Sequence, residues 1–154
     1  MSRVIEIELE KAWVFRHWLG PDGRTNALSA GEMIGQGVQD MTYGVQFAFR
    51  AFDISVDGKY LDYDDKKSLF DKYGVQMVPI LYRGPFSKAK VEQFTDGPTT
   101  MCDSKVAGTF KGREGIVITP VKERFSSDMS GSGRVILKSV SFAYLERSNG
   151  TEFH

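Results

Sequence analysis

The sequence predicts an α+β fold built mainly from antiparallel sheets, with two or three short helices. Short apolar stretches with the alternating period of β-strands recur along the chain. The Asp57-Gly58 pair is typical of a tight hairpin between two such stretches. The two clearest helical patterns, residues 64–73 and 87–94, are both short. Together these features favour strands joined in mainly hairpin order, with the helices placed between them.

Length and composition restrict the class of protein. The chain has 154 residues and a mass of 17.3 kDa, which suits one domain. Its 20 basic and 20 acidic side chains balance, so the net charge gives no preference for nucleic acid. A single cysteine, Cys102, excludes an internal disulfide framework and a cysteine-cluster zinc site. No apolar run approaches the roughly 20 residues of a membrane-spanning helix, so we expect a cytoplasmic protein.

The N-terminal half predicts strands separated by glycine-rich turns. Residues 4–10 alternate apolar and acidic side chains, as a half-buried strand does. Residues 20–23 indicate a turn, and residues 31–39 open with three glycines in seven positions, which favours a loop. Residues 46–56 form the strongest strand; both faces are largely apolar, which predicts a central position. Residues 59–61 would be its hairpin partner.

The C-terminal half predicts two helices and three more strands. Ser87 is a good N-cap for the second helix, Gly74 a good end for the first, and Pro79 favours an edge strand or a bulge. The predicted elements are a helix at 64–73, a strand at 75–82, a helix at 87–94, a loop at 95–112, a strand at 114–118, a charged connection at 121–134, a strand at 135–140 and a helical turn at 142–147.

Four side chains are unusual for their predicted positions. Asp53 is an acid inside an aromatic strand, so it needs a partner or a shifted pKa. Lys138 interrupts the apolar run of a core strand, so it must reach water, an acid or a ligand. Glu114 is most simply a strand-entry acid paired with Arg113. Phe52, taken alone, is more often a core residue than a stacking platform.

Taken in order, these residues resemble the nucleotidyltransferase motifs of phage-type ATP-dependent RNA ligases. Each motif alone is weak, but five in the family's order indicate membership. The matching segments are residues 31–39 (GEMIGQGVQ, like GE-x-x-G-x-G-[IV]-Q), 49–54 (FRAFDI, like motif III), 78–84 (VPILYRG, like motif IIIa), 113–118 (REGIVI, like motif IV) and 135–140 (VILKSV, like motif V).

The resemblance implies a fold and a domain layout. The chain would form part of the nucleotidyltransferase (adenylation) domain shared by RNA and DNA ligases. We expect one partial domain over residues 1–154, with a divergent N-terminal segment at 1–30, a motif-bearing core at 31–147 and a tail at 148–154. The cell would be bacterial or phage-infected.

The resemblance also implies roles for the four unusual side chains and for Glu32. Phe52 would stack on adenine, and Glu32 would accept hydrogen bonds from the ribose. Asp53 would belong to the nucleotide site in a role the resemblance leaves open. Glu114 would hold Mg²⁺, since a carboxylate is a favoured ligand of that ion. Lys138 would contact the α-phosphate as a catalytic point charge. The cofactors implied are Mg²⁺ and ATP or AMP, and RNA is a further expected partner.

One family motif is absent from these 154 residues. The nucleophile of such ligases lies in lysine-x-[Asp/His/Asn]-Gly, and no such tetrapeptide occurs here. Asp22-Gly23 matches its second half, but Gly20 stands where the lysine should be. We therefore expect that the isolated chain cannot form a lysyl-AMP intermediate. A missing segment, a separate chain or a second copy would have to complete the site.

Two other functions remain open from the sequence. The chain could be a non-catalytic module of phage origin that binds or sequesters a nucleotide or RNA. It could also be an inactive remnant that folds as an oligomer through exposed strand edges, unless the strand at residues 4–10 caps the opened sheet. Nucleotide titration separates the first from the second, and light scattering tests the oligomer.

Overall fold

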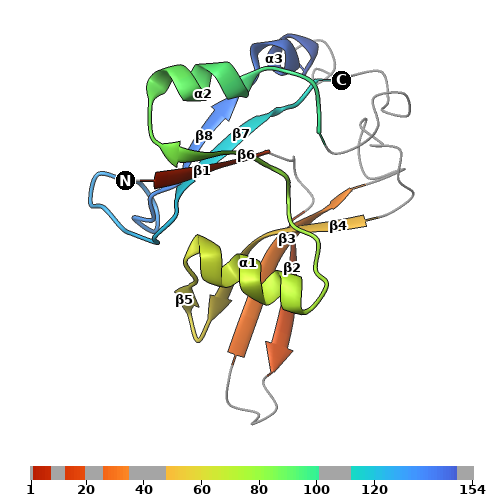
Figure 1. Ribbon diagram of the computed structural model, residues 1–154, viewed down its shortest axis with the longest axis vertical. Helices are drawn as coiled ribbons and strands as arrows, with labels where there is room; N and C mark the ends of the chain where they lie inside the picture. The colour runs from red at the N-terminus through yellow and green to blue at the C-terminus, as the bar shows by residue number, and fades with distance from the viewer. Residues whose placement is uncertain (1, 8–12, 20–25, 35–47, 101–111, 149–154) are drawn as a thin grey trace.

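The computed structural model describes residues 2–7, 13–19, 26–34, 48–100 and 112–148. Within these ranges the chain forms two four-stranded sheets and three short helices (Figure 1). All strand pairs within the two sheets are antiparallel, which confirms the predicted α+β class. No helix in the described ranges is long and apolar enough to cross a membrane.

The first sheet, sheet B, follows the predicted hairpin order. Its strands are consecutive: β2 (Trp13–Leu19), β3 (Asn26–Ile34), β4 (Ala48–Val56) and β5 (Lys59–Tyr60). The backbone between β4 and β5 has positive φ at both Asp57 (49°) and Gly58 (79°), the geometry of a type I′ turn. The predicted Asp57-Gly58 hairpin is therefore confirmed, and β4 lies inside the sheet as expected.

The second sheet, sheet A, departs from hairpin order. Its strands lie in the order β6 (Ile80–Pro85), β1 (Ser2–Ile7), β7 (Gly115–Pro120) and β8 (Leu137–Val140). Only β7 and β8 are neighbours both in sequence and in the sheet. The N-terminal strand pairs on both sides, with β6 and with β7. The N-terminal strand is therefore an internal strand of sheet A and covers one edge each of β6 and β7.

Each sheet is covered by a short helix. Helix α1 (Tyr63–Lys72) packs on sheet B, where Phe70 forms a buried cluster with Ala51 and Ile54. Helix α2 (Lys88–Thr95) packs on sheet A, where Val91 and Phe94 cover the buried strand β7. Figure 1 shows α2 and the last helix, α3 (Phe142–Ser148), in one half of the molecule and α1 in the other.

The helix boundaries match the predicted ends closely. Ser87 is the N-cap of α2, as predicted, and its Oγ accepts a hydrogen bond from the Lys90 N–H at 3.2 Å. Asp62 occupies the N-cap of α1, and the helix begins at Tyr63, one residue before the predicted start at residue 64. Gly74 follows the C-cap of α1 with φ of 66°, as a helix-ending glycine does.

The predicted strand at residues 75–82 is divided between the two sheets. Its first part pairs with β4, since the Ala51 N–H donates to the Gln76 carbonyl and the Val78 N–H donates to the Ala51 carbonyl, both at 2.9 Å. Its second part begins β6 at Ile80 in sheet A. Pro79 lies between the two parts. This segment therefore carries the chain from one sheet to the other.

Two local predictions are wrong. Residues 31–34 are not loop but the end of β3; residues 35–39 of the same motif, like the predicted turn at 20–23, lie outside the described residues. Strand β8 is not a core strand at its start, because Leu137 and Lys138 are both exposed. An exposed lysine is ordinary on a protein surface. A functional role for Lys138 therefore cannot be argued from burial of its charge.

Candidate functional site

Gly31 and Glu32 are consecutive residues of β3, in the part of the strand that pairs with β4. Glu32 is 3% exposed and stands opposite Arg50 in the strand register. A Cβ atom on Gly31 would lie 2.3 Å from Cζ of Phe49 and 2.6 Å from the Arg50 carbonyl oxygen. Contacts this short do not occur in real structures, so the glycine allows β4 and the Phe49 ring to approach β3 closely.

Phe52 is the extra residue of a β-bulge in β4. The register pairs Ala30 with Asp53 and Gly31 with Ala51, and so passes over Phe52. Ala51 and Asp53 are buried, whereas Phe52 is partly exposed. Bulges of this kind re-aim a side chain and are common beside functional sites. The β4 bulge (Ala51–Asp53) thus places a partly exposed aromatic residue between two buried neighbours.

Asp53 belongs to a buried group of four charges, which we call the Arg134 network (Asp53, Lys66, Glu123 and Arg134). The Arg134 Nη1 donates to Oδ2 of Asp53, and its Nε and Nη2 donate to Glu123 at 2.8 and 2.6 Å. Lys66 Nζ lies 3.9 Å from the other Asp53 oxygen. The side chains are 3 to 11% exposed. Two cations and two anions balance, which makes their burial tolerable.

The guanidinium of Arg134 is held from several sides. It lies 3.7 Å from the centre of the Tyr60 ring, within the range of a cation–π contact. Burial lowers the pKa of Arg134, but the hydrogen bonds to Glu123 and Asp53 outweigh burial, and the net shift is upward. Arg134 is therefore a permanent cation that ties the segment before β8 to β4.

The other three members of the Arg134 network were not singled out in the sequence. Asp53 was expected to need a partner, but Arg134 is 81 residues away and lies in a segment predicted to be a charged connection. The burial of Lys66 could have been predicted from its spacing. Together with Tyr63 and Phe70, it follows the three- and four-residue spacing of a helix face turned to the core. A lysine within such a face needs a buried partner.

Glu114 and Lys138 lie in sheet A and differ in exposure. Glu114 directly precedes β7 and is 3% exposed, and its carbonyl oxygen accepts the Ser141 N–H at 2.7 Å. Lys138 stands opposite Val117 in the pairing of β7 with β8 and is exposed. The Arg113 guanidinium donates to the carbonyl oxygens of Phe94 and Pro98, at 3.1 and 3.0 Å.

The predicted site residues therefore fall into two groups. Glu32, Phe52 and Asp53 are brought together by the pairing of β3 with β4. Glu114 and Lys138 both lie in the β7–β8 region of sheet A, but they are not paired, since Lys138 stands opposite Val117, three residues beyond Glu114. The ion pair between Asp53 and Arg134 links the first group to the segment that leads into β8.

A magnesium ion would have one buried protein carboxylate at Glu114. In the part of the chain that the structure describes, no group of three or more His, Cys, Asp or Glu side chains could hold a metal by itself. Mg²⁺ usually keeps several waters and takes one or two carboxylates together with substrate phosphates. The donor set here fits that kind of site and does not fit an all-protein cage.

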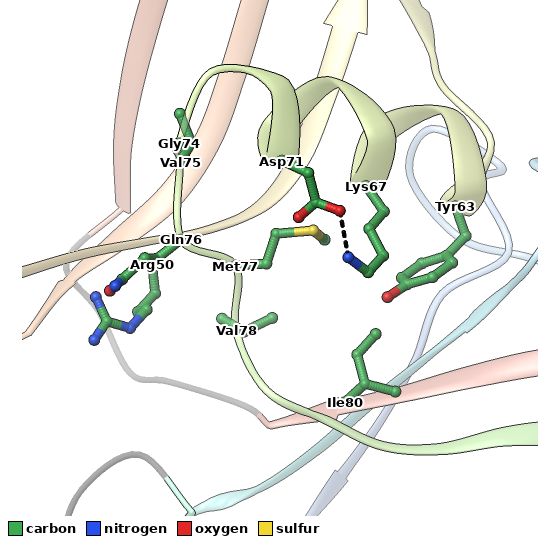
Figure 2. Close-up of a pocket in the computed structure, with 10 residues that line it drawn as sticks. All are labelled: Arg50, Tyr63, Lys67, Asp71, Gly74, Val75, Gln76, Met77, Val78 and Ile80. Atoms are coloured by element: carbon green, nitrogen blue, oxygen red, sulfur yellow. Dashed lines mark hydrogen bonds and ion pairs between the residues drawn. The ribbon is translucent and has the colours of Figure 1, made fainter.

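A separate pocket of about 500 Å³ lies beside α1 (Figure 2). Its polar lining includes Arg50 and the ion pair between Lys67 and Asp71, whose charged atoms are 2.5 Å apart. Burial lowers the pKa of Arg50, whose Nη1 donates to the Phe49 carbonyl at 3.0 Å. None of the five predicted site residues lines this pocket. Its wall is completed by Tyr63, Gly74, Val75, Gln76, Met77, Val78 and Ile80.

Comparisons with known proteins agree on one family. The model of a family described as RNA ligase matches residues 7–140. Two solved structures, titled Archaeal ATP-dependent RNA ligase forms 1 and 2, share the fold with TM-scores of 0.62 and 0.58 at 17% and 16% identity. The alignments cover 96% and 95% of this chain but only 44% of each archaeal chain. No curated protein matches the sequence.

Proposed function

Since the chain belongs to the RNA ligase family, we propose that its 154 residues form part of a nucleotidyltransferase site that binds an adenine nucleotide. The chain spans less than half of the two archaeal ligase structures it resembles. Ligation of RNA would therefore need residues beyond those present here. Binding of the nucleotide is the part of the activity that these residues can support.

The observation that carries this proposal is the β4 bulge. A partly exposed Phe52 stands between buried neighbours, and Asp53 beside it is fixed by Arg134. An aromatic side chain held in place suits adenine, because base stacking on an aromatic side chain contributes about 1–3 kcal/mol. Phe52 is the aromatic residue that we assign to this stacking.

The remaining site residues would serve the sugar and the phosphates. We assign the buried Glu32 to the ribose, since a carboxylate accepts hydrogen bonds from hydroxyl groups. Glu114 would hold a Mg²⁺ ion, which neutralises phosphate charge when bound. The exposed Lys138 would contact the α-phosphate, for which a mobile ammonium group is suited.

The covalent step needs a lysine that these residues do not supply. In the reaction proposed, a lysine amine attacks the α-phosphorus of ATP, a phosphoramidate bond forms and pyrophosphate leaves. No lysine-x-[Asp/His/Asn]-Gly tetrapeptide occurs in the sequence. The nucleophile would come from a segment outside these 154 residues or from another chain.

Isothermal titration calorimetry of the 154-residue chain with ATP and AMP, with and without Mg²⁺, tests nucleotide binding. We expect binding without turnover. Phe52→Ala should weaken it about tenfold or more, because stacking is lost. Phe142→Ala is the matched control, since Phe142 is 68% exposed on α3 and should not affect binding. No heat with any adenine nucleotide would refute the proposed function.

A further inference from the structure

Lysine 66 contacts the backbone of Phe52 directly. Its Nζ donates a hydrogen bond of 2.7 Å to the Phe52 carbonyl oxygen. Lys66 belongs to α1, and Phe52 lies in the bulge of the strand beneath that helix. The contact therefore joins a helix to the one residue of β4 that the β3 register passes over.

The burial of Lys66 is unusual for its type. The residue is 2% exposed, whereas lysine is almost never fully buried without a partner. Its position between Tyr63 and Phe70 would accommodate an apolar side chain without desolvating a charge. The ammonium is compensated by the Phe52 carbonyl, by Asp53 at 3.9 Å and by the face of Tyr63 at 5.5 Å. The contacts with Phe52 and Asp53 hold the amine close to the bulge.

We propose that Lys66 is a positioning residue that fixes the β4 bulge and so sets the orientation of the Phe52 ring. A bulge interrupts the regular ladder, so its backbone is held less firmly than the rest of a strand. The ammonium replaces ladder contacts at the Phe52 carbonyl. In an adenine-binding site, this hydrogen bond would keep the Phe52 ring in its stacking position before the nucleotide binds. The entropic cost of ordering the ring on binding would then be lower. The role in binding rests on the proposed function; the contact itself does not.

The neighbouring lysine provides a matched control. Lys67 lies on the same helix but is 49% exposed in its side chain and pairs with Asp71. The variants Lys66→Met and Lys67→Met therefore remove the same charge from adjacent positions, one of which contacts Phe52. Lys66→Arg retains a buried cation and tests rescue. If Lys66→Met does not fold, Lys66→Gln takes its place, because its shorter side chain cannot reach the same carbonyl.

The first measurement needs no nucleotide. In NMR spectra of the isotope-labelled chain, Lys66→Met should move the carbonyl-carbon resonance of Phe52, and Lys67→Met should leave it in place. The second measurement is AMP affinity by calorimetry. We expect Lys66→Met to weaken binding about tenfold, Lys66→Arg to restore most of it, and Lys67→Met to leave it unchanged. In a Phe52→Ala background, Lys66→Met should have almost no further effect, because both residues act through one ring.

The outcomes separate the two proposals. If the unmodified chain binds AMP and Phe52→Ala weakens binding, but Lys66→Met binds like the unmodified chain, the role of Lys66 is refuted and the proposed function stands. Additive losses in the double variant would also refute the role, since they would mean that Lys66 acts independently of the ring. If the unmodified chain binds no adenine nucleotide, the proposed function fails and any role of Lys66 in binding fails with it.

Discussion

Arg134 and Asp53 are 81 residues apart in sequence and form an ion pair in which both side chains are less than 10% exposed. The same guanidinium binds Glu123 and packs on the Tyr60 ring. Removal of one member of such a group leaves uncompensated charge in a nonpolar environment. The ion pair therefore joins the strand that carries the proposed stacking residue to the segment that leads into β8.

Replacement of Arg134 should strongly destabilise the fold. Arg134→Met would leave the carboxylates of Asp53 and Glu123 buried without their guanidinium, at a cost of about 3–5 kcal/mol in the free energy of unfolding. Urea denaturation measures this change. Lys122→Met is the control: Lys122 binds Asp62 with a side chain that is 79% exposed, and such surface pairs contribute little to stability. Equal effects of the two variants would contradict the prediction.

Gly31→Ala should also destabilise the fold, by forcing β3 and β4 apart. The added Cβ would meet the Arg50 carbonyl at 2.6 Å as well as the Phe49 ring. Backbone cannot move aside cheaply, and overpacking typically costs about 1–3 kcal/mol.

Gly84→Ala, in β6, is the control for Gly31→Ala. There the added Cβ would meet mainly the Tyr82 hydroxyl end, which a side-chain rotation can remove. Thermal unfolding should show a large loss for Gly31→Ala and a small one for Gly84→Ala. A reversed order would show that the close approach of β3 and β4 is not required.

Stability should fall in acid through two aspartates at the start of α1. A hydrogen bond from Lys122, and then one from the Glu123 N–H, lowers the pKa of Asp62, and a hydrogen bond from Arg83 lowers that of Asp64. Both groups are more acidic in the folded chain than in the unfolded chain. Their contribution is therefore complete above about pH 4 and is lost as the pH falls through the folded values.

Thermal unfolding between neutral pH and strongly acidic pH measures this effect. Asp62→Asn and Asp64→Asn should each make the loss of stability in acid less steep. Arg83 binds Asp64 with N–O distances of 2.5 and 2.7 Å. Arg83→Gln should therefore remove the contribution of Asp64 to the pH dependence of stability, as Asp64→Asn does. Unfolding curves that do not change with these substitutions would contradict the assignment.

A separate segment that contains lysine-x-Asp-Gly should restore adenylylation if the chain is part of a ligase. Mixed with the 154-residue chain and α-phosphate-labelled ATP, the segment should acquire the label on its lysine. Glu114→Ala should reduce labelling at limiting Mg²⁺, because the proposed metal ligand is removed. Lack of labelling with every segment, combined with nucleotide binding, would favour the non-catalytic binding module instead.

Local features could be predicted from the sequence because they depend on neighbouring residues. The hairpin at Asp57-Gly58 follows from two residues that tolerate positive φ, and the start of α2 follows from the Ser87 side chain. The antiparallel α+β class followed from the alternation of apolar residues.

Long-range features could not be predicted in this way. The place of β1 between β6 and β7 depends on pairings with segments more than 70 and 100 residues away. Arg134 gives no sign in its own neighbourhood that it binds Asp53. Glycine 31 was expected in a loop because glycine favours loops, yet it lies in β3 because only glycine fits against Phe49. The assigned roles of Glu32, Phe52, Glu114 and Lys138 remain predictions.

The internal position of β1 has a consequence for how the chain folds. Each half of sheet A needs this strand, because β6 and β7 do not pair with each other and meet only through it. During synthesis, β1 emerges before β6 and β7 and cannot gain its second neighbour until Pro120 has been made. Contacts between distant segments slow folding, since a long loop must close before they form. Sheet B, whose strands follow one another, can assemble first, and sheet A is expected to close late.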